Sequence, residues 1–365
     1  MATTVNYQCP HCSAPLSFIP GNKTVTCEYC GNEFEIAAIE KMFEEQQKMA
    51  AKELDAQNAK WDTQEAGGEW SQDEIKNLRA LTCSACGAEL VCDENTMATE
   101  CCYCGNPTMV PQRFSGMLKP DLVIPFKKSK QEAVAALKKF YEGKKLLPDA
   151  FTANNRVESI QPMYVPFWLF DSTVEAHLNV RAEKDRVREN SSERITETSV
   201  YNCTRGGTMR FEKIPADGSK KMNDTYMESI EPFDYSELEP FSAAYFTGYL
   251  ADKYDVTAEE SVSRTDKRLE ETAIDLLAQT VQGYDRVRPM SHAIIKQKSK
   301  VIYAMVPVWI LTTRYENQPY TFMMNGQTGK FIGSLPSDSG KAFKYSAAAT
   351  LISFPILYFL ISMLT

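Results

Sequence analysis

Cys9-Pro-His-Cys12 and Cys27-Glu-Tyr-Cys30 stand near the start of the chain, and the pattern returns as Cys83-Ser-Ala-Cys86 and Cys101-Cys-Tyr-Cys104. Fourteen residues separate the two pairs in each copy, and all four cysteine positions repeat at an offset of 74 residues. A CxxC turn lets two thiolates converge on one metal ion, and two such turns complete a tetrahedral site. The spacing therefore predicts two zinc ribbons, each folded around one Zn2+ ion.

The predicted zinc ligands are the eight cysteines of these pairs. They are Cys9, Cys12, Cys27 and Cys30 in the first ribbon and Cys83, Cys86, Cys101 and Cys104 in the second. Four thiolates leave no coordination position for water or substrate, so both ions are predicted to be structural. Cys102 could take the place of Cys101 as a metal ligand, but the CxxC spacing to Cys104 favours Cys101. His11 is interpreted as an exposed non-ligand, and Cys92 and Cys203, which have no partner at ligand spacing, as packed thiols.

The second ribbon is acidic. Residues 81 to 112 contain no lysine or arginine, and they include Glu89, Asp93, Glu94 and Glu100. A four-thiolate zinc centre adds about two further negative charges, so this surface repels phosphate. The ribbons are therefore interpreted as protein-interaction modules, and nucleic acid is not an expected partner. A nucleic-acid-binding zinc-ribbon protein is the alternative.

The composition is that of a globular protein with more than one folded unit. The 365 residues are 43% hydrophobic and 24% charged, and 40 basic against 48 acidic side chains leave a net charge of −8. At roughly 150 residues per domain, this length predicts two or three units. Residues 1 to 8 show no charged and apolar leader pattern, so no secretory signal is expected. The folded part is expected in the cytosol, where reduced cysteine pairs are more often metal ligands than disulfides.

The middle of the chain predicts helices and strands in two related sets. Residues 36 to 61 have the composition of a long helix without Pro or Gly, and Ala66-Gly67-Gly68 suggests a hinge. Val165-Pro-Phe-Trp168 and Val306-Pro-Val-Trp309 each follow a predicted helix, which indicates a duplicated helix-plus-strands unit. Proline within an apolar run is typical of an edge strand or a bulge.

Two strand pairs are predicted within this region. Residues 199 to 203 and 208 to 211 are expected to be separate strands, split by the Arg205-Gly-Gly sequence. Residues 320 to 324 and 330 to 334 are expected to form a hairpin around the Asn325-Gly-Gln-Thr-Gly329 turn.

Catalytic motifs are absent from the sequence. Beyond His11, the histidines are His177 and His292, more than a hundred residues apart, and no HExxH, GxSxG, GxxxxGK[ST] or GxGxxG pattern occurs. The sequence therefore predicts that the protein is not an enzyme.

The last twenty-one residues, from Tyr345 to Thr365, carry no charged side chain. A helix of this length would extend roughly 31 Å, and a hydrocarbon core is about 30 Å thick. A C-terminal transmembrane helix is predicted at residues 343 to 365. Lys341 and Lys344 at its start place the N-terminal bulk on the cytoplasmic side of a cell membrane that the chain crosses once.

Several of these motifs together resemble one protein family. The second ribbon, the Lys119-Pro-Asp-Leu-Val-Ile-Pro-Phe126 run, the two Val-Pro-x-Trp motifs and the Asn325-Gly-Gln-Thr-Gly329 turn are similar to bacterial TFIIB-type zinc-ribbon-containing proteins. Members are membrane-associated and are often encoded beside SPFH (flotillin-like) and PspA-type membrane-stress proteins. The resemblance implies a membrane adaptor that recruits an SPFH/flotillin-like or PspA-like partner at the cytoplasmic membrane, with another small membrane protein as a further candidate partner.

The predicted fold class is α+β, with two small four-cysteine zinc ribbons, a duplicated α+β domain and one C-terminal transmembrane helix. The predicted boundaries are 1–35 for the first ribbon, 36–79 for a helical spacer and hinge, 80–112 for the second ribbon, 113–340 for the duplicated domain and 343–365 for the anchor.

Overall fold

The computed structural model describes residues 7–12, 14–18, 23–58, 60–96, 100–154, 157–190, 193–222 and 224–364, and it is an α+β fold. The chain divides into two compact units. The first comprises Met1–Trp61, Asp171–Glu212 and Asp266–Ser299, and the second comprises Asp62–Phe170, Lys213–Thr265 and Lys300–Thr365. Four long elements contribute to both units: β7 (Gln161–Glu189), β8 (Arg194–Asp217), α6 (Ala258–Gln279) and β11 (Arg286–Tyr315).

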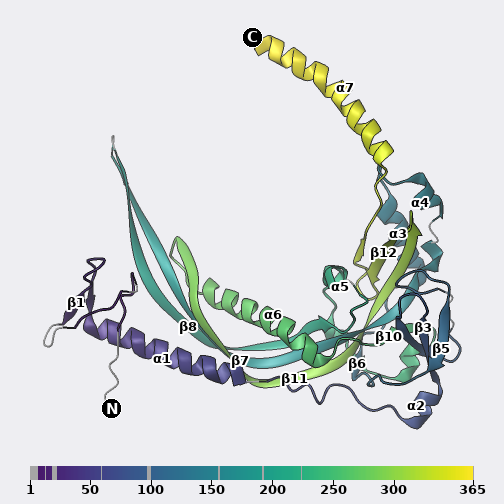
Figure 1. Cartoon of the computed structure of the whole chain (residues 1–365), viewed down its shortest axis with the longest axis horizontal. Coiled ribbons are helices and arrows are strands. Elements are labelled where there is room, and N and C mark those ends of the chain that lie inside the picture. Colours follow the sequence, from purple (N-terminus) through teal and green to yellow (C-terminus); the bar gives the residue numbers. More distant parts are fainter. Residues whose placement is uncertain are drawn as a thin grey trace. The chain divides into compact units, whose positions relative to one another are not determined.

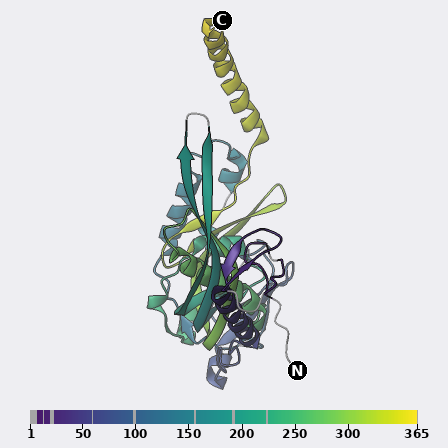
Figure 2. The ribbon, with the colours of Figure 1, turned by 90° about the vertical axis from the view of Figure 1, so that its left-hand side faces the viewer.

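The first unit contains the first ribbon, a long helix and one part of the long strands. Strands β1 (Thr24–Thr26) and β2 (Glu33–Glu35) form an antiparallel pair, and α1 (Ile36–Asn58) follows directly. Ile39 of α1 is buried against Leu16 and Val25 of the ribbon, so the start of the predicted spacer helix belongs to the ribbon core. Strands β7 and β8 form a long twisted hairpin (Figures 1 and 2).

The second unit is built on one mixed sheet with the strand order β13-β12-β11-β7-β10-β4-β3-β5. Its shorter strands are β3 (Leu78–Cys83), β4 (Glu89–Asp93), β5 (Met109–Arg113), β6 (Leu122–Val123), β9 (Glu239–Pro240), β10 (Leu250–Asp252), β12 (Gln318–Asn325) and β13 (Phe331–Gly333). Its shorter helices are α2 (Gln72–Lys76), α3 (Lys130–Tyr141), α4 (Asp149–Asn154) and α5 (Asp224–Ile230). The antiparallel pairing of β12 with β13 confirms the predicted hairpin around residues 325 to 329.

Both faces of this sheet are buried. Alternate residues of β11 point to opposite faces, and each set packs against a different helix. Val306, Val308 and Ile310 pack with α5 on one face. Trp309 and Leu311 pack with α3 on the other face. A strand covered on both faces is expected to be continuously apolar, as the run from 301 to 311 is.

The two Val-Pro-x-Trp motifs make matching contacts. The indole Nε1 of Trp168 donates to the carbonyl of Val256, two residues before α6, at 2.9 Å. The indole of Trp309 donates to the carbonyl of Lys128, two residues before α3, also at 2.9 Å. Such paired contacts are what a duplicated unit predicts.

The prolines of these motifs do not mark sheet edges, against the prediction. Pro166 and Pro307 lie in β7 and β11, which occupy the interior of the strand order. Beside each proline a glycine approaches closely, since Gly218 donates to the Pro166 carbonyl and Gly326 to the Pro307 carbonyl, both at 2.8 Å.

Residues 199 to 211 form part of one continuous strand, so the predicted pair of separate strands is wrong. Strand β8 runs through Gly206 and Gly207 without a turn. A Cβ atom at Gly206 would lie 2.9 Å from Nδ1 of His177 on β7, whereas one at Gly207 would meet nothing within 4 Å. Gly206 therefore allows β8 to pass a bulky neighbour and does not interrupt the strand.

The predicted transmembrane helix is not borne out. Helix α7 (Ser339–Leu364) begins before the expected anchor, and Thr365 lies outside the described residues. Among the described residues, no helix is both long and apolar enough to cross a membrane. The described side chains that follow Lys344 extend to Pro355, about 16 Å of helix, and they include Ser346, Thr350 and Ser353. The prediction of a single-pass membrane protein with its bulk on the cytoplasmic side is therefore wrong.

Candidate metal centres

Each four-cysteine set converges on one point. In the first ribbon, the Sγ atoms of Cys9 and Cys30 lie 3.6 Å apart, as do those of Cys12 and Cys27. In the second ribbon the corresponding distances are 3.6 Å for Cys83 and Cys104 and 3.7 Å for Cys86 and Cys101. Within each cluster, all four sulfur atoms lie within 4.8 Å of one another.

These distances fit a tetrahedral metal site. A zinc–thiolate bond of about 2.3 Å places the sulfur atoms of a regular four-thiolate site roughly 3.8 Å apart. The two clusters can therefore hold metal ions, and they are formed by the eight cysteines that the spacing singled out.

The turns that carry the second cysteine pair have the same hydrogen bonds in both ribbons. The amide of Cys27 donates to the carbonyl of Asn32 and that of Gly31 to the carbonyl of Cys27, at 2.8 and 2.9 Å. The second ribbon repeats both bonds at an offset of 74 residues, each at 2.8 Å. Gly31 and Gly105 adopt φ of +73° and +69°, a conformation that glycine reaches without steric penalty.

Backbone amides in these turns favour the thiolate form that a metal requires. Burial alone would raise the pKa of the Cys27 thiol, but amides of Cys30 and Tyr29 and neighbouring thiols donate to the sulfur and lower its pKa to about 7. Donation from the Cys102 thiol, together with the amides of Cys104 and Tyr103, lowers the pKa of Cys101 to about 4 against the effect of burial.

Cys101 and Cys102 are neighbours with different surroundings. The sulfur of Cys101 belongs to the cluster, whereas that of Cys102 is buried in the sheet core, 3.7 Å from Sδ of Met163. Cys92 is buried and Cys203 contacts the hydroxyl of Tyr284 at 3.6 Å, so both are packed thiols, as predicted. His11 is exposed, and only its backbone amide contacts a cluster sulfur, that of Cys9 at 3.4 Å.

The second ribbon is an integral part of the sheet of its unit. Its strand β4 pairs with β10, with Val91 opposite Ala251. Its carbonyls also accept side-chain hydrogen bonds from the rest of that unit. Thr312 donates to the carbonyl of Cys102 at 2.7 Å, Arg314 to that of Cys104 at 3.0 Å, and Lys221 to that of Cys86 at 2.7 Å.

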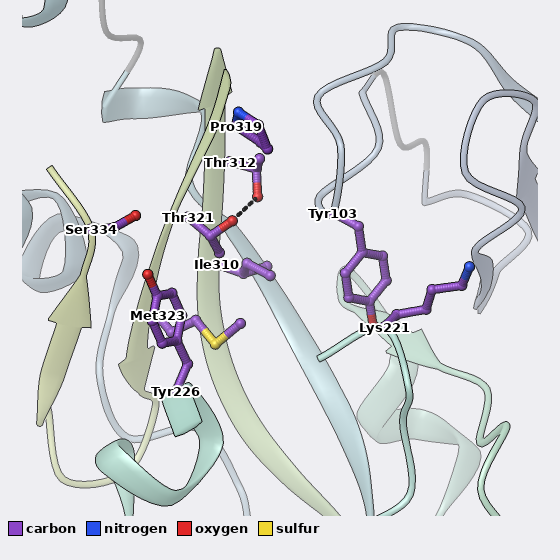
Figure 3. Close-up of a pocket in the computed structure, with 9 residues that line it drawn as sticks. All are labelled: Tyr103, Lys221, Tyr226, Ile310, Thr312, Pro319, Thr321, Met323 and Ser334. Carbon is purple, nitrogen blue, oxygen red and sulfur yellow. Dashed lines mark hydrogen bonds between the residues drawn. The ribbon is translucent and has the colours of Figure 1, made fainter. Parts of the chain in front are cut away.

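Tyr103, in the second CxxC turn of this ribbon, is packed against the core of its unit. Its ring lies beside a cavity of about 180 Å³, across from Thr312 and Thr321, whose hydroxyls are 3.1 Å apart (Figure 3). Asp252, which interacts electrostatically with Tyr103, is only 2% exposed. Burial raises the pKa of the Asp252 carboxyl to about 7, although the hydroxyls of Ser219 and Tyr103 act in the opposite direction.

The first ribbon has a different environment. Tyr29, at the tip of its second CxxC turn, is 75% exposed, and Cys12 is exposed as well. A cavity of about 290 Å³ lies within the same unit, between the ribbon, α1 and the long strands. Its apolar lining comes mainly from Phe34, Met42, Phe43, Val200 and Met290, and Asn179 and Arg181 supply polar groups.

The fold and these clusters define an α+β protein with two four-cysteine sites that can hold metal ions. The chain is 32% identical over 337 residues to the uncharacterized protein YdjG of Bacillus subtilis (strain 168), and the alignment covers 92% of each chain. The chain therefore belongs to the same family as YdjG. No protein-family model and no solved structure matches the chain, so the resemblance to TFIIB-type zinc-ribbon proteins stays a prediction.

Proposed function

We propose that the chain is a zinc-dependent, non-enzymatic adaptor that binds a protein partner through its first ribbon. The observation that carries this proposal is the contrast between the two ribbons. The second ribbon uses its turn to pack against its own unit, whereas the equivalent turn of the first ribbon exposes Tyr29. Exposed aromatic side chains on a rigid support are favoured anchors of protein interfaces.

Zinc is the proposed ion because four thiolates in tetrahedral arrangement are its usual structural site. A closed four-thiolate sphere gives zinc a folding role and no open position for chemistry. The cavity beside the first ribbon supports binding of a partner there, because its apolar lining suits an apolar side chain. Phe43 lines this cavity and also packs against the ribbon core.

The partner class comes from the family resemblance. We propose an SPFH/flotillin-like or PspA-like protein. The test is binding of the zinc-loaded full chain to a purified SPFH protein and, separately, to a purified PspA-like protein encoded in the same genome. Binding to one of them at micromolar or lower concentration is expected, and failure with both overturns the choice of partner.

A matched pair of variants tests the surface. Tyr29→Ala is expected to weaken binding at least tenfold, because interface aromatic anchors contribute about 2 kcal/mol or more. Tyr345→Ala removes another exposed tyrosine, 50% exposed on α7, and should leave binding unchanged. Equal loss in both variants would contradict the role of the first ribbon. Retention on a DNA resin at low salt, lost on addition of salt, would instead support the nucleic-acid alternative.

A further inference from the structure

Strand β8 presents a long open edge in the first unit. Among the strands that the structure describes, β8 pairs with β7 on one side and with no strand on the other. Its residues 194 to 212 are largely exposed, including Ile195 at 53%, Val200 at 42% and Tyr201 at 44%. Unpaired N–H and C=O groups along such an edge are a template for another strand.

The two faces of this part of β8 contact elements of its own unit. Cys203, Met209 and Phe211 point to the α6 side, where they pack against the cluster around Leu277. On the other side, the hydroxyl of Thr204 contacts Oε2 of Glu45 on α1 at 3.5 Å. Near residues 203 to 211, β8 thus contacts its own unit on both faces, and the edge that faces away from β7 is left for a partner.

We propose that two copies of this chain associate through antiparallel pairing of their β8 strands, with Cys203 opposite Cys203 of the second copy at the twofold axis. Antiparallel pairing of identical strands is self-complementary, as a twofold dimer requires. In an antiparallel pair, the numbers of opposite residues add up to a constant. Opposite residues share one face of the sheet and side chains alternate along a strand, so in a pair of identical strands both numbers are odd or both are even and their sum is even.

The charges on β8 favour this register over those centred on residues 202 and 204, and the register centred on residue 201, which pairs Glu197 with Arg205, instead places Ile195 opposite Gly207. With Cys203 at the centre, Arg194 lies opposite Glu212 of the second copy, and each such pair occurs twice. Shifting the centre to residue 202 places Arg194 opposite Arg210, a pair of like charges, and shifting it to residue 204 brings no opposite charges together. Opposite charges across a strand pair stabilise it and like charges destabilise it.

Neighbouring positions agree with the same register. Ile195 lies opposite Phe211, which joins two apolar side chains on the α6 side. Tyr201 lies opposite Arg205, a pair suited to cation–π contact. The proposal does not depend on the adaptor function or on zinc as the ion.

Charge reversal in the zinc-loaded full chain tests the pairing. By sedimentation velocity, the wild type is expected to dimerise at micromolar concentration. Arg194→Glu and Glu212→Arg should each raise the dimer dissociation constant roughly tenfold, because each places two like-charged pairs in the interface. The double variant R194E/E212R should restore it to within about threefold.

Glu197→Arg is the matched control, since this register places Glu197 opposite the uncharged Met209. It should leave the dissociation constant unchanged. Weakening by Glu197→Arg alone would favour the register centred on residue 201, where Glu197 faces Arg205, and would overturn the one proposed here. A wild type that remains monomeric at about 100 µM, or a double variant as weak as the single ones, overturns the proposal as well.

Cys203 provides an independent readout. Mild oxidation of the zinc-loaded wild type should give a covalent dimer on a non-reducing gel, because directly opposed cysteines on antiparallel strands have Cα atoms within disulfide range. Cys203→Ser should lose the covalent dimer and keep the sedimenting one. A covalent dimer that persists in Cys203→Ser would contradict the proposed contact.

Discussion

The adjacent pair Cys101 and Cys102 gives a sharp prediction about the second metal centre. Replacing Cys101 by serine removes one of four clustered sulfur atoms, whereas replacing Cys102 by serine changes a side chain that faces Met163 in the core. We expect Cys101→Ser to lower the zinc content from two ions per chain to one, and Cys102→Ser to leave it at two. Metal analysis of freshly reduced, dialysed protein measures this directly.

The expected effects on stability also differ. A structural zinc ion contributes about 10–16 kcal/mol, as much as the whole stability of a typical domain, so the second ribbon should unfold in Cys101→Ser. Cys102→Ser buries a hydroxyl in an apolar site that is 3% exposed, which costs about 1–3 kcal/mol and lowers the melting temperature by a few degrees.

The repeat supplies a control in the first ribbon. Cys27 is the equivalent of Cys101, but β1 and β2 form a sheet of their own and β3, β4 and β5 do not. Cys27→Ser should therefore also remove one zinc ion, yet leave the melting of the second unit unchanged. If Cys102→Ser lost zinc while Cys101→Ser kept both ions, the assignment of ligands would be wrong.

Three further outcomes are expected. Gly206→Ala should destabilise the fold by about 1–3 kcal/mol in chemical denaturation, because its Cβ would lie 2.9 Å from His177, whereas Gly207→Ala should be neutral or slightly stabilising. The Asp252 carboxyl has a folded pKa of about 7, above its unfolded value, so its contribution to stability falls as pH rises from about 4 to 7. In thermal melts, Asp252→Asn should therefore raise stability by on the order of 2 kcal/mol at pH 8 and change it little at pH 4. Thr257→Ala removes the hydroxyl that accepts from the third amide of α6 at 3.2 Å and should cost about 1 kcal/mol in the same melts.

The sequence predicted the features that depend on local chemistry. The CxxC spacing identified the eight cysteines that converge. The hairpin around residues 325 to 329 followed from turn residues between apolar strands. Each of these is a short-range pattern whose physical cause lies within a few residues or in a strict repeat.

Features that depend on tertiary neighbours were missed. Gly206-Gly207 suggests a turn, and the neighbour that favours an extended glycine, His177, lies on another strand. The Pro166 and Pro307 carbonyls are bonded by glycines from later in the chain, which a local reading of proline does not anticipate. The transmembrane helix predicted at residues 343 to 365 from length, apolar content and lack of charge is the reverse case, because no described helix is both long and apolar enough to cross a membrane.

One difference between the repeats does carry tertiary information. At the offset of 74 residues, the position after the third cysteine is Glu28 in the first ribbon and Cys102 in the second. Glu28 is exposed and Cys102 is buried against the sheet. Because the turns have the same hydrogen bonds, the side chain at this position distinguishes a ribbon that packs against its own unit from one whose turn stays exposed. A charged residue there cannot be buried without a partner, whereas a thiol can. Residues 27 to 32 and 101 to 106 differ only at this position, so the exchange of an acid for a cysteine indicates, from sequence alone, which ribbon keeps its turn exposed.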